Sequence, residues 1–137
     1  MLLRAKAASQ GLSSAEQQQL RLLNAYFDAF LPVIGALKDL GLADRMAFGS
    51  DAGPFDTEFG HMEYSVHLAR LAGLSPMQSL QVVTRNAARL MGLDDRIGTL
   101  EADKAGDILA LHANPLEDPQ HLTSVAAVYQ AGVKVVG

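Results

Sequence analysis

The sequence predicts an α/β protein that is helical, with one short strand, up to about Gly92 and rich in β-strands beyond it. Before Gly92, apolar residues recur at three- and four-residue intervals in three segments, which is the spacing of one face of a helix. After Gly92 they come in short runs bounded by Gly, Pro and Asn, as in buried strands. The 137 residues suffice for one domain and contain no internal repeat.

The first helix is expected to begin after Ser13, because Ser13 and Glu16 have the spacing of a capping box. Its apolar face consists of Leu20, Leu23, Phe27, Phe30, Ile34 and Leu37. Pro32 lacks a backbone donor and is expected to kink this helix or to split it in two. Gly41 is the predicted stop.

A short strand is expected over residues 45–48, which are mainly apolar and are followed by a Gly/Pro loop. The second helix is predicted to begin near Asp56 or Thr57 and to run to Ala72, where Gly73 ends it.

The third helix has the strongest start signal of the chain. Ser75 is an N-cap, Pro76 occupies the first helical position, and Gln78 completes a capping box. We expect one continuous helix from this point to Gly92.

The tail beyond Gly92 is predicted to be β. The expected strands lie at residues 97–100, 108–111, 125–129 and 133–136. The last two flank a loop of hairpin length in which Gly132 can adopt the positive φ that such a turn needs.

Composition excludes several classes of function. Eleven basic and fifteen acidic residues give a net charge of −4 without a basic stripe, so no nucleic-acid partner is expected. The sequence has no cysteine, which excludes disulfides, thiolate metal sites and cysteine nucleophiles. Any metal would be held by His, Asp or Glu.

No apolar stretch is expected to be long enough to span a bilayer, so no membrane partner is predicted. The charges near the N-terminus lie inside a short apolar stretch, which is the wrong order for a secretion signal. A cytoplasmic location follows as the expectation.

Asp51 is the leading candidate for chemistry. It stands in Gly49-Ser50-Asp51-Ala52, directly after the apolar run 46–48. A carboxylate at the carboxyl end of a buried strand faces the loop side of an α/β fold, where active sites form. Asp51 is therefore a candidate metal ligand or general base. The alternative is that it only caps the turn, since Asp after Gly-Ser commonly bonds nearby backbone N–H groups.

Several segments, in order, resemble the C-terminal part of a metal-dependent amidohydrolase of the imidazolonepropionase and prolidase-like group. They include Thr84-Arg85-Asn86-Ala87-Ala88-Arg89-Leu90 and Ile97-Gly98-Thr99-Leu100-Glu101. The other matching segments are residues 49–53, 72–80, 107–111 and 114–116. One departure is residues 103–107, which replace the family's usual β-turn pattern and leave the geometry of that turn open.

The resemblance implies a (β/α)8 TIM barrel followed by a small β-sandwich built from both ends of the polypeptide. Residues 1–92 would then be the C-terminal segment of the barrel, and residues 93–137 strands of the composite sandwich. Residues 46–48 would be the last barrel strand. Asp51 would match the aspartate that binds the catalytic metal and accepts a proton from the attacking water.

The same resemblance implies that most of the site is absent from this chain. The family's His-x-His pair and its other ligands precede the matching segments, and a complete barrel takes about 250 residues. We therefore expect an incomplete barrel that is inactive alone. The complete enzyme is expected to hold a divalent metal, zinc. No metal is expected to be bound to this chain by itself. Completion would come from an N-terminal barrel segment or a homo-oligomer.

The loop and helix after the last strand border the pocket in this family, so Phe55, Phe59 and His61 are candidate substrate contacts. His61-Met62-Glu63 also matches the His-x-Glu of zinc deaminases, but the partner motif of those enzymes needs cysteines. His61 and His67 are six residues apart, whereas two ligands on one helical face are three or four apart.

Two functions stay open on the sequence. The first is a metal-dependent hydrolase of C–N bonds in a small amide, cyclic amide or peptide-like substrate, present here as a C-terminal fragment. The second is a non-catalytic α/β module derived from an amidohydrolase tail and acting in assembly only.

Overall fold

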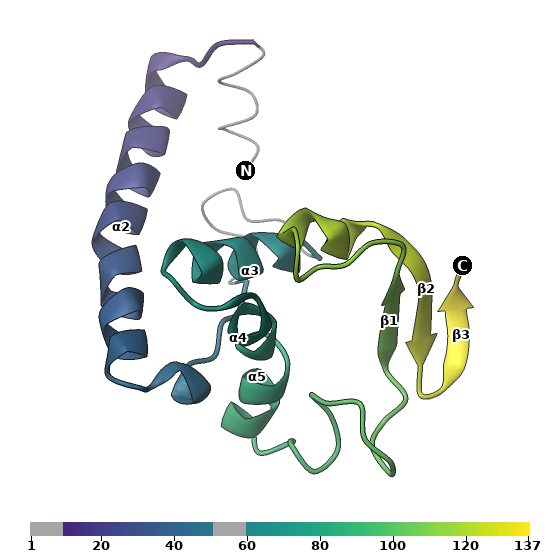
Figure 1. Cartoon of the computed structure of the whole chain (residues 1–137). Helices are drawn as coiled ribbons and strands as arrows, with labels where there is room; N and C mark the ends of the chain where they lie inside the picture. Colours follow the sequence, from purple (N-terminus) through teal and green to yellow (C-terminus); the bar gives the residue numbers. More distant parts are fainter. Residues whose placement is uncertain (1–9, 51–59) are drawn as a thin grey trace.

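The computed structural model describes residues 10–50 and 60–137 (Figure 1). A long helix runs along one side, short helices fill the middle, and a small antiparallel sheet lies at the opposite side. The elements are α2 (Ser14–Asp39), η1 (Ala43–Arg45), α3 (Met62–Leu71), α4 (Pro76–Gln81), α5 (Arg85–Leu90), β1 (Ile108–Leu111), η3 (Pro119–Thr123), β2 (Val125–Gln130) and β3 (Val133–Val136). The predicted α/β class is confirmed.

Helix α2 begins as its sequence predicts. The Ser13 N–H donates to Glu16 Oε2 at 2.9 Å, and the Glu16 N–H donates to Ser13 Oγ at 3.4 Å, so both halves of the capping box are present. The helix is continuous through Pro32, so the alternative that proline splits it is wrong. Gly41, with φ +75°, follows the helix end as expected.

Helix α2 is also long and apolar enough to cross a membrane by length and composition, and it lies near the N-terminus. The expectation that no stretch has this length was therefore wrong. Core helices of soluble proteins and signal sequences share these properties, so this helix alone is weak evidence that the chain crosses a membrane. Four large apolar residues of α2 are exposed: Leu22, Tyr26, Phe30 and Val33.

Helix α3 begins later than predicted. Residues 56 and 57 lie outside the described part of the chain, and Gly60, with φ +84°, and the non-helical His61 separate them from the first helical residue, Met62. The predicted C-terminal stop is confirmed, because the helix ends at Leu71 and Gly73 has φ +88°.

The predicted third helix is broken into α4 and α5. Its start is as expected, with Ser75 and Gln78 forming a complete capping box. Thr84, however, has φ −124° and ψ −95°, outside the helical region. At this break the Val82 carbonyl accepts a hydrogen bond of 2.9 Å from the Phe48 N–H. A bond to a distant segment thus replaces helical continuity.

The strand expected over residues 45–48 is not formed within the described residues. Arg45 ends the short helix η1, and residues 46–48 are not paired with any strand. Met46 is extended, with φ −88° and ψ 140°. A strand needs hydrogen bonds to a neighbouring strand. The Phe48 N–H instead donates to the Val82 carbonyl, at the break between α4 and α5.

The tail forms one antiparallel sheet in the order β1-β2-β3. Ile108 pairs with Tyr129 in the first ladder, and Gln130 pairs with Val133 beside the hairpin turn. Gly132 has φ +79°, as the hairpin prediction requires. The strand predicted at residues 97–100 is wrong, because turns fill this region and the Ile97 N–H donates back to the Leu93 carbonyl.

Lys104 organises the turns between α5 and β1. Its ammonium donates to the Asp94 carbonyl at 2.7 Å and to Thr99 Oγ1 at 2.5 Å, and lies 3.2 Å from Glu101 Oε2. Hydrogen bonds from Lys104 and Thr99 and the charge of Lys104 hold the pKa of Glu101 below its ordinary value. Asp103, in the divergent turn, has a positive φ of +68°.

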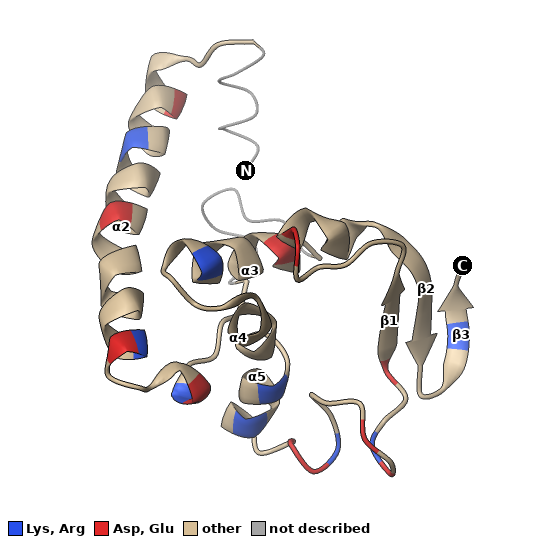
Figure 2. Cartoon of the chain, viewed as in Figure 1, with Lys and Arg blue, Asp and Glu red and all other residues tan. Residues whose placement is uncertain are grey.

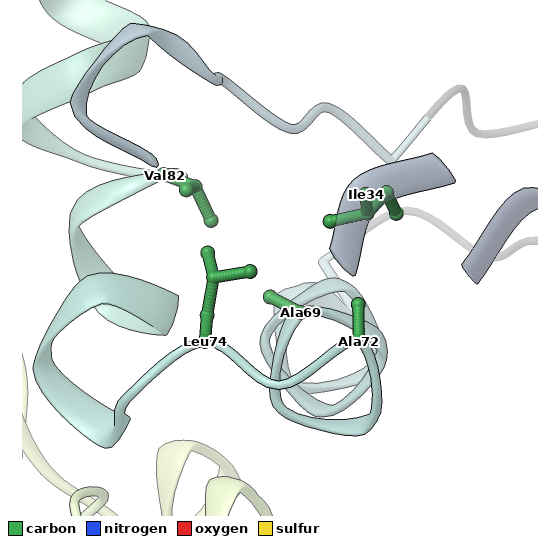
Figure 3. Close-up of a cluster of buried hydrophobic side chains, with 5 residues drawn as sticks. All are labelled: Ile34, Ala69, Ala72, Leu74 and Val82. Atoms are coloured by element: carbon green, nitrogen blue, oxygen red, sulfur yellow. The ribbon is translucent and has the colours of Figure 1, made fainter. Parts of the chain in front are cut away.

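The core lies where α2, α3 and α4 meet. It consists of Ile34, Ala69, Ala72, Leu74 and Val82 (Figure 3). Met46 and Phe48 pack against this cluster from the segment that leads to residue 51. Burial of apolar surface therefore anchors the same segment as the backbone bond to Val82.

Gly98 provides a test of the packing between α5 and the following turns. A Cβ there would lie 2.6 Å from Ala88 Cβ and 3.2 Å from the Thr84 carbonyl oxygen, at a φ of +94°. We expect Gly98→Ala to lower the free energy of unfolding by about 3 kcal/mol or more, from backbone strain and overpacking together.

Gly92→Ala is the matched control, because Gly92 has φ +67° with no atom within 4 Å of the added Cβ. It should cost about 1–2 kcal/mol, from strain alone. Urea unfolding of both variants measures the difference, and equal losses would contradict the close contact with α5.

Candidate functional site

The sequence-predicted site residues fall into two groups. Asp51, Phe55 and Phe59 lie outside the described residues, so their placement stays a prediction. His61 is described and directly precedes α3. The structure shows how the chain is held on the two sides of residues 51–59.

A buried asparagine holds the segment before Asp51. Asn86 is 4% exposed, and its Nδ2 donates to the Met46 carbonyl at 2.9 Å and to the Ala43 carbonyl at 3.2 Å. Its Oδ1 accepts from Arg85 Nε at 3.3 Å. Both polar atoms of this amide are therefore hydrogen-bonded, and the amide binds the carbonyls of the first residue of η1 and of the residue that follows η1.

Further contacts fix the same segment. Arg85 Nη2 donates to Asp44 Oδ1 at 2.9 Å, and the Phe48 N–H donates to the Val82 carbonyl at 2.9 Å. The Arg85–Asp44 pair is partly exposed and contributes little by itself. Together, these bonds and the apolar contacts of Met46 and Phe48 fix residues 43–48 against α4 and α5.

Asn86 was not singled out from the sequence, although it lies in the matching segment Thr84 to Leu90. The helical period around it suggested only a helix face. A polar amide among apolar neighbours was the available signal, because a buried amide needs hydrogen-bond partners from another segment.

His61 and Glu63 form a pair at the start of α3. His61 Nδ1 lies 2.8 Å from Glu63 Oε1, and the side-chain exposures are 49% for the histidine and 4% for the glutamate. Nδ1 is thus the ring nitrogen that faces the Glu63 carboxylate. The pair therefore fixes how the His61 ring is oriented.

The described residues do not by themselves supply a metal centre. Residues 10–50 and 60–137 contain no group of three or more His, Cys, Asp or Glu side chains that could hold a metal ion. Protein zinc sites use at least three such ligands. His121, in the tail, instead lies with Nδ1 2.8 Å from the Asn114 carbonyl oxygen.

Charged residues of both signs are interspersed along the helices and loops (Figure 2). Arg85 and Arg89 of α5 lie near acidic partners, Asp44 at 2.9 Å and Asp94 at 3.9 Å. These charges serve local pairing between neighbouring segments.

Comparison with known proteins decides the family. Residues 21–135 match the amidohydrolase family. This chain belongs to the amidohydrolase family. The amidohydrolase resemblance drawn from the sequence, including its imidazolonepropionase and prolidase-like group, is therefore confirmed.

The curated relatives of this amidohydrolase chain are much longer. It is 37% identical over 103 residues to an imidazolonepropionase of Deinococcus deserti, which covers 72% of this chain and 25% of that protein. It is 37% identical over 82 residues to an imidazolonepropionase of Aromatoleum aromaticum, covering 59% of this chain and 19% of that protein. The chain thus spans a quarter or less of the length of these two relatives.

Solved structures give the same relationship. A Xaa-Pro dipeptidase with bound methionine in its active site superposes with a TM-score of 0.69 at 26% identity, covering 78% of this chain and 25% of the other. A putative prolidase from Bifidobacterium longum gives a TM-score of 0.68 at 32% identity, covering 74% of this chain and 25% of the other. The amidohydrolase chain thus shares its local fold with a part of these proteins.

The Asn86 amide provides a test of how the segment before Asp51 is held. In Asn86→Ala the Met46 carbonyl loses the amide donor, and the Ala43 carbonyl keeps only the 3.3 Å bond from the Met46 N–H, so we expect the free energy of unfolding to fall by about 2–3 kcal/mol. Asn86→Asp has nearly the same size but cannot donate, so it should lose at least as much.

Asn114→Ala serves as the control, because the Asn114 amide is exposed and donates to Glu117 Oε1 at 3.3 Å. It should cost about 1 kcal/mol or less. If urea unfolding gave equal losses for Asn86→Ala and Asn114→Ala, the buried amide would not be the anchor.

Proposed function

We propose that this chain is part of a metal-dependent hydrolase that acts on a C–N bond of an amide, a cyclic amide or a peptide-like small molecule. The observation that carries the proposal is the anchored segment 43–48, which leads directly to Gly49-Ser50-Asp51 within a chain of the amidohydrolase family. The similarity to imidazolonepropionases and to a Xaa-Pro dipeptidase supports C–N bonds as the target.

In this proposal Asp51 is both a metal ligand and the acceptor of the proton from the attacking water. A divalent metal, zinc, would lower the pKa of a bound water when present. The Asp51 carboxylate would help to hold that metal, accept a proton from the attacking water and pass it to the leaving nitrogen. Anchoring of residues 43–48 by Asn86 and Val82 limits the positions that this carboxylate can take.

The remaining ligands come from outside this chain in the proposal. The described donor set does not hold a metal by itself, and the relatives are at least four times as long as the region they share with this chain. We propose that an upstream barrel segment, or a homo-oligomer, completes a TIM barrel and that the chain alone is inactive. The sheet β1-β2-β3 would belong to a sandwich beside that barrel.

Exposed apolar surface supports a completing polypeptide. Leu22 and Tyr26 of α2 are 66% and 59% exposed, and Val133 of β3 is 65% exposed. Exposed apolar side chains clustered on one element favour coverage by a partner. We further propose a cytoplasmic location, with neither nucleic acid nor membrane as a partner.

A non-catalytic role in assembly is the second candidate, favoured by the lack of a three-ligand metal group among the described residues. The genomic sequence upstream of Met1 discriminates between the two. A reading frame or neighbouring gene that carries the His-x-His motif favours the hydrolase, and a lack of one favours the assembly role.

Asp51→Asn tests the proposed chemistry in a complex that restores the barrel with an upstream polypeptide. The amide keeps the size of the carboxylate but cannot accept the proton, so kcat for amide hydrolysis should fall about a hundredfold or more. Asp39→Asn, in an exposed pair with Lys38 on α2, is the matched control and should keep kcat. Unchanged kcat in Asp51→Asn, with the circular dichroism spectrum intact, would reduce Asp51 to a turn residue.

A further inference from the structure

One face of helix α2 is apolar and exposed along most of its length. Leu22, Tyr26 and Val33 are 66%, 59% and 53% exposed, and Leu40, the C-cap, is 73% exposed. Helix α2 runs along one side of the molecule, and Ile34 is its one buried residue (Figure 1). An exposed apolar face of this extent marks an interaction surface.

The exposed residues recur with the spacing of a coiled-coil seam. Along the helix the positions are alternately four and three residues apart, and every one of them is exposed. A seven-residue repeat of this kind keeps one stripe of a helix facing a second helix. The stripe, named here the α2 seam, consists of Ala15, Gln19, Leu22, Tyr26, Ala29, Val33, Ala36 and Leu40.

The α2 seam is complementary to itself when two copies run antiparallel. A two-fold axis midway along the helix places Tyr26 opposite Ala29 of the second copy, and Ala29 opposite its Tyr26. In all the resulting pairs except Leu22–Val33, a large side chain meets an alanine, so the two helices can interdigitate without voids. The pairs are Ala15–Leu40, Gln19–Ala36, Leu22–Val33 and Tyr26–Ala29.

The charge of the helix also favours a second copy as the occupant. Two copies of a chain with a net charge of −4 repel each other, but no residue of the α2 seam is charged. Helices that lie on membranes carry a polar face rich in Lys and Arg. Helix α2 instead has more acidic than basic residues: Glu16, Asp28 and Asp39 against Arg21 and Lys38.

We propose that two copies of this chain associate as an antiparallel dimer through the α2 seam. The interaction goes beyond the proposed hydrolase function and does not involve Asp51. Helix α2 has 26 residues and is about 39 Å long. One helix face offers fewer than the roughly 20–30 residues a side of a standard interface, so the dissociation constant should be about 1–100 μM.

The first experiment is analytical ultracentrifugation of the full chain over a series of concentrations. Ala29→Glu places a carboxylate opposite Tyr26 twice in each dimer, so the dissociation constant should rise about a hundredfold or more. Gln17→Glu is the matched control, because it adds the same charge at an exposed position of α2 outside the seam. It should change the dissociation constant by about threefold or less. Circular dichroism checks that both variants keep their helices.

The second experiment tests the antiparallel register by disulfide cross-linking. The chain has no cysteine, so introduced thiols are the only ones present. An oxidised equimolar mixture of Gln19→Cys and Ala36→Cys should give a covalent heterodimer, because these positions oppose each other in the seam. Each variant alone should stay unlinked, because the two equivalent positions are about 25 Å apart in an antiparallel dimer.

Several outcomes would overturn the proposal. These are a chain that stays monomeric at about 100 μM, a chain that forms only larger aggregates, and equal dissociation constants for Ala29→Glu and Gln17→Glu. Cross-linking of each single variant but not of the mixture would show a parallel pair instead.

The test also reveals a different occupant of the seam. Vesicles of phosphatidylcholine and phosphatidylglycerol that pellet a monomeric wild-type chain, but not Ala29→Glu, would assign the seam to a membrane surface. An upstream polypeptide that binds the monomeric wild-type chain, but not Ala29→Glu, would assign it to completion of the barrel. Either result would overturn the dimer and leave the proposed role of Asp51 intact.

Discussion

The side-chain amide of Asn86 is the interaction on which the rest of the structure around Asp51 depends. It donates to two carbonyls, of Ala43 and Met46, that lie about forty residues earlier in the chain. The segment between them is the short 3₁₀ helix η1, which is followed by the unpaired residues 46–48. One buried side chain of α5 thus binds this segment through two of its backbone carbonyls.

Helices α4 and α5 adapt to this requirement. In a continuous helix the Val82 carbonyl would point along the helix axis. Here the helix is broken at Thr84, and the Val82 carbonyl accepts a hydrogen bond from the Phe48 N–H. Val82 is also fully buried in the core, so the same residue binds the segment through its backbone and packs beneath it through its side chain. Packing of α2, α3 and α4 therefore determines where the chain enters residues 51–59.

Local signals in the sequence predicted the structure well. The capping boxes at Ser13 and Ser75 and the helix stops at Gly41 and Gly73 depend only on nearby residues, and each is observed. The hairpin around Gly132 likewise depends on its own turn.

Predictions that needed distant partners were less successful. The expected strand at residues 45–48 and the unbroken third helix were wrong for one shared reason, the bonds between that segment and the Val82–Asn86 region. Spacing along one sequence cannot reveal a bond across forty residues. The amidohydrolase family was predictable because several ordered segments carry it together. The role of Asp51 stays a prediction, while the Glu63–His61 pair required the structure to be seen.

Amide hydrogen exchange at Phe48 tests most directly whether the segment before Asp51 is anchored as described. The Phe48 N–H should be protected to the same degree as the Leu74 N–H, which is bonded to the Ala69 carbonyl in the adjacent core. Asn86→Ala should speed exchange at Phe48 more than tenfold while Leu23, in the middle of α2, keeps its rate. Exchange at Phe48 as fast as in an unstructured peptide, or unaffected by Asn86→Ala, would contradict the anchoring of this segment.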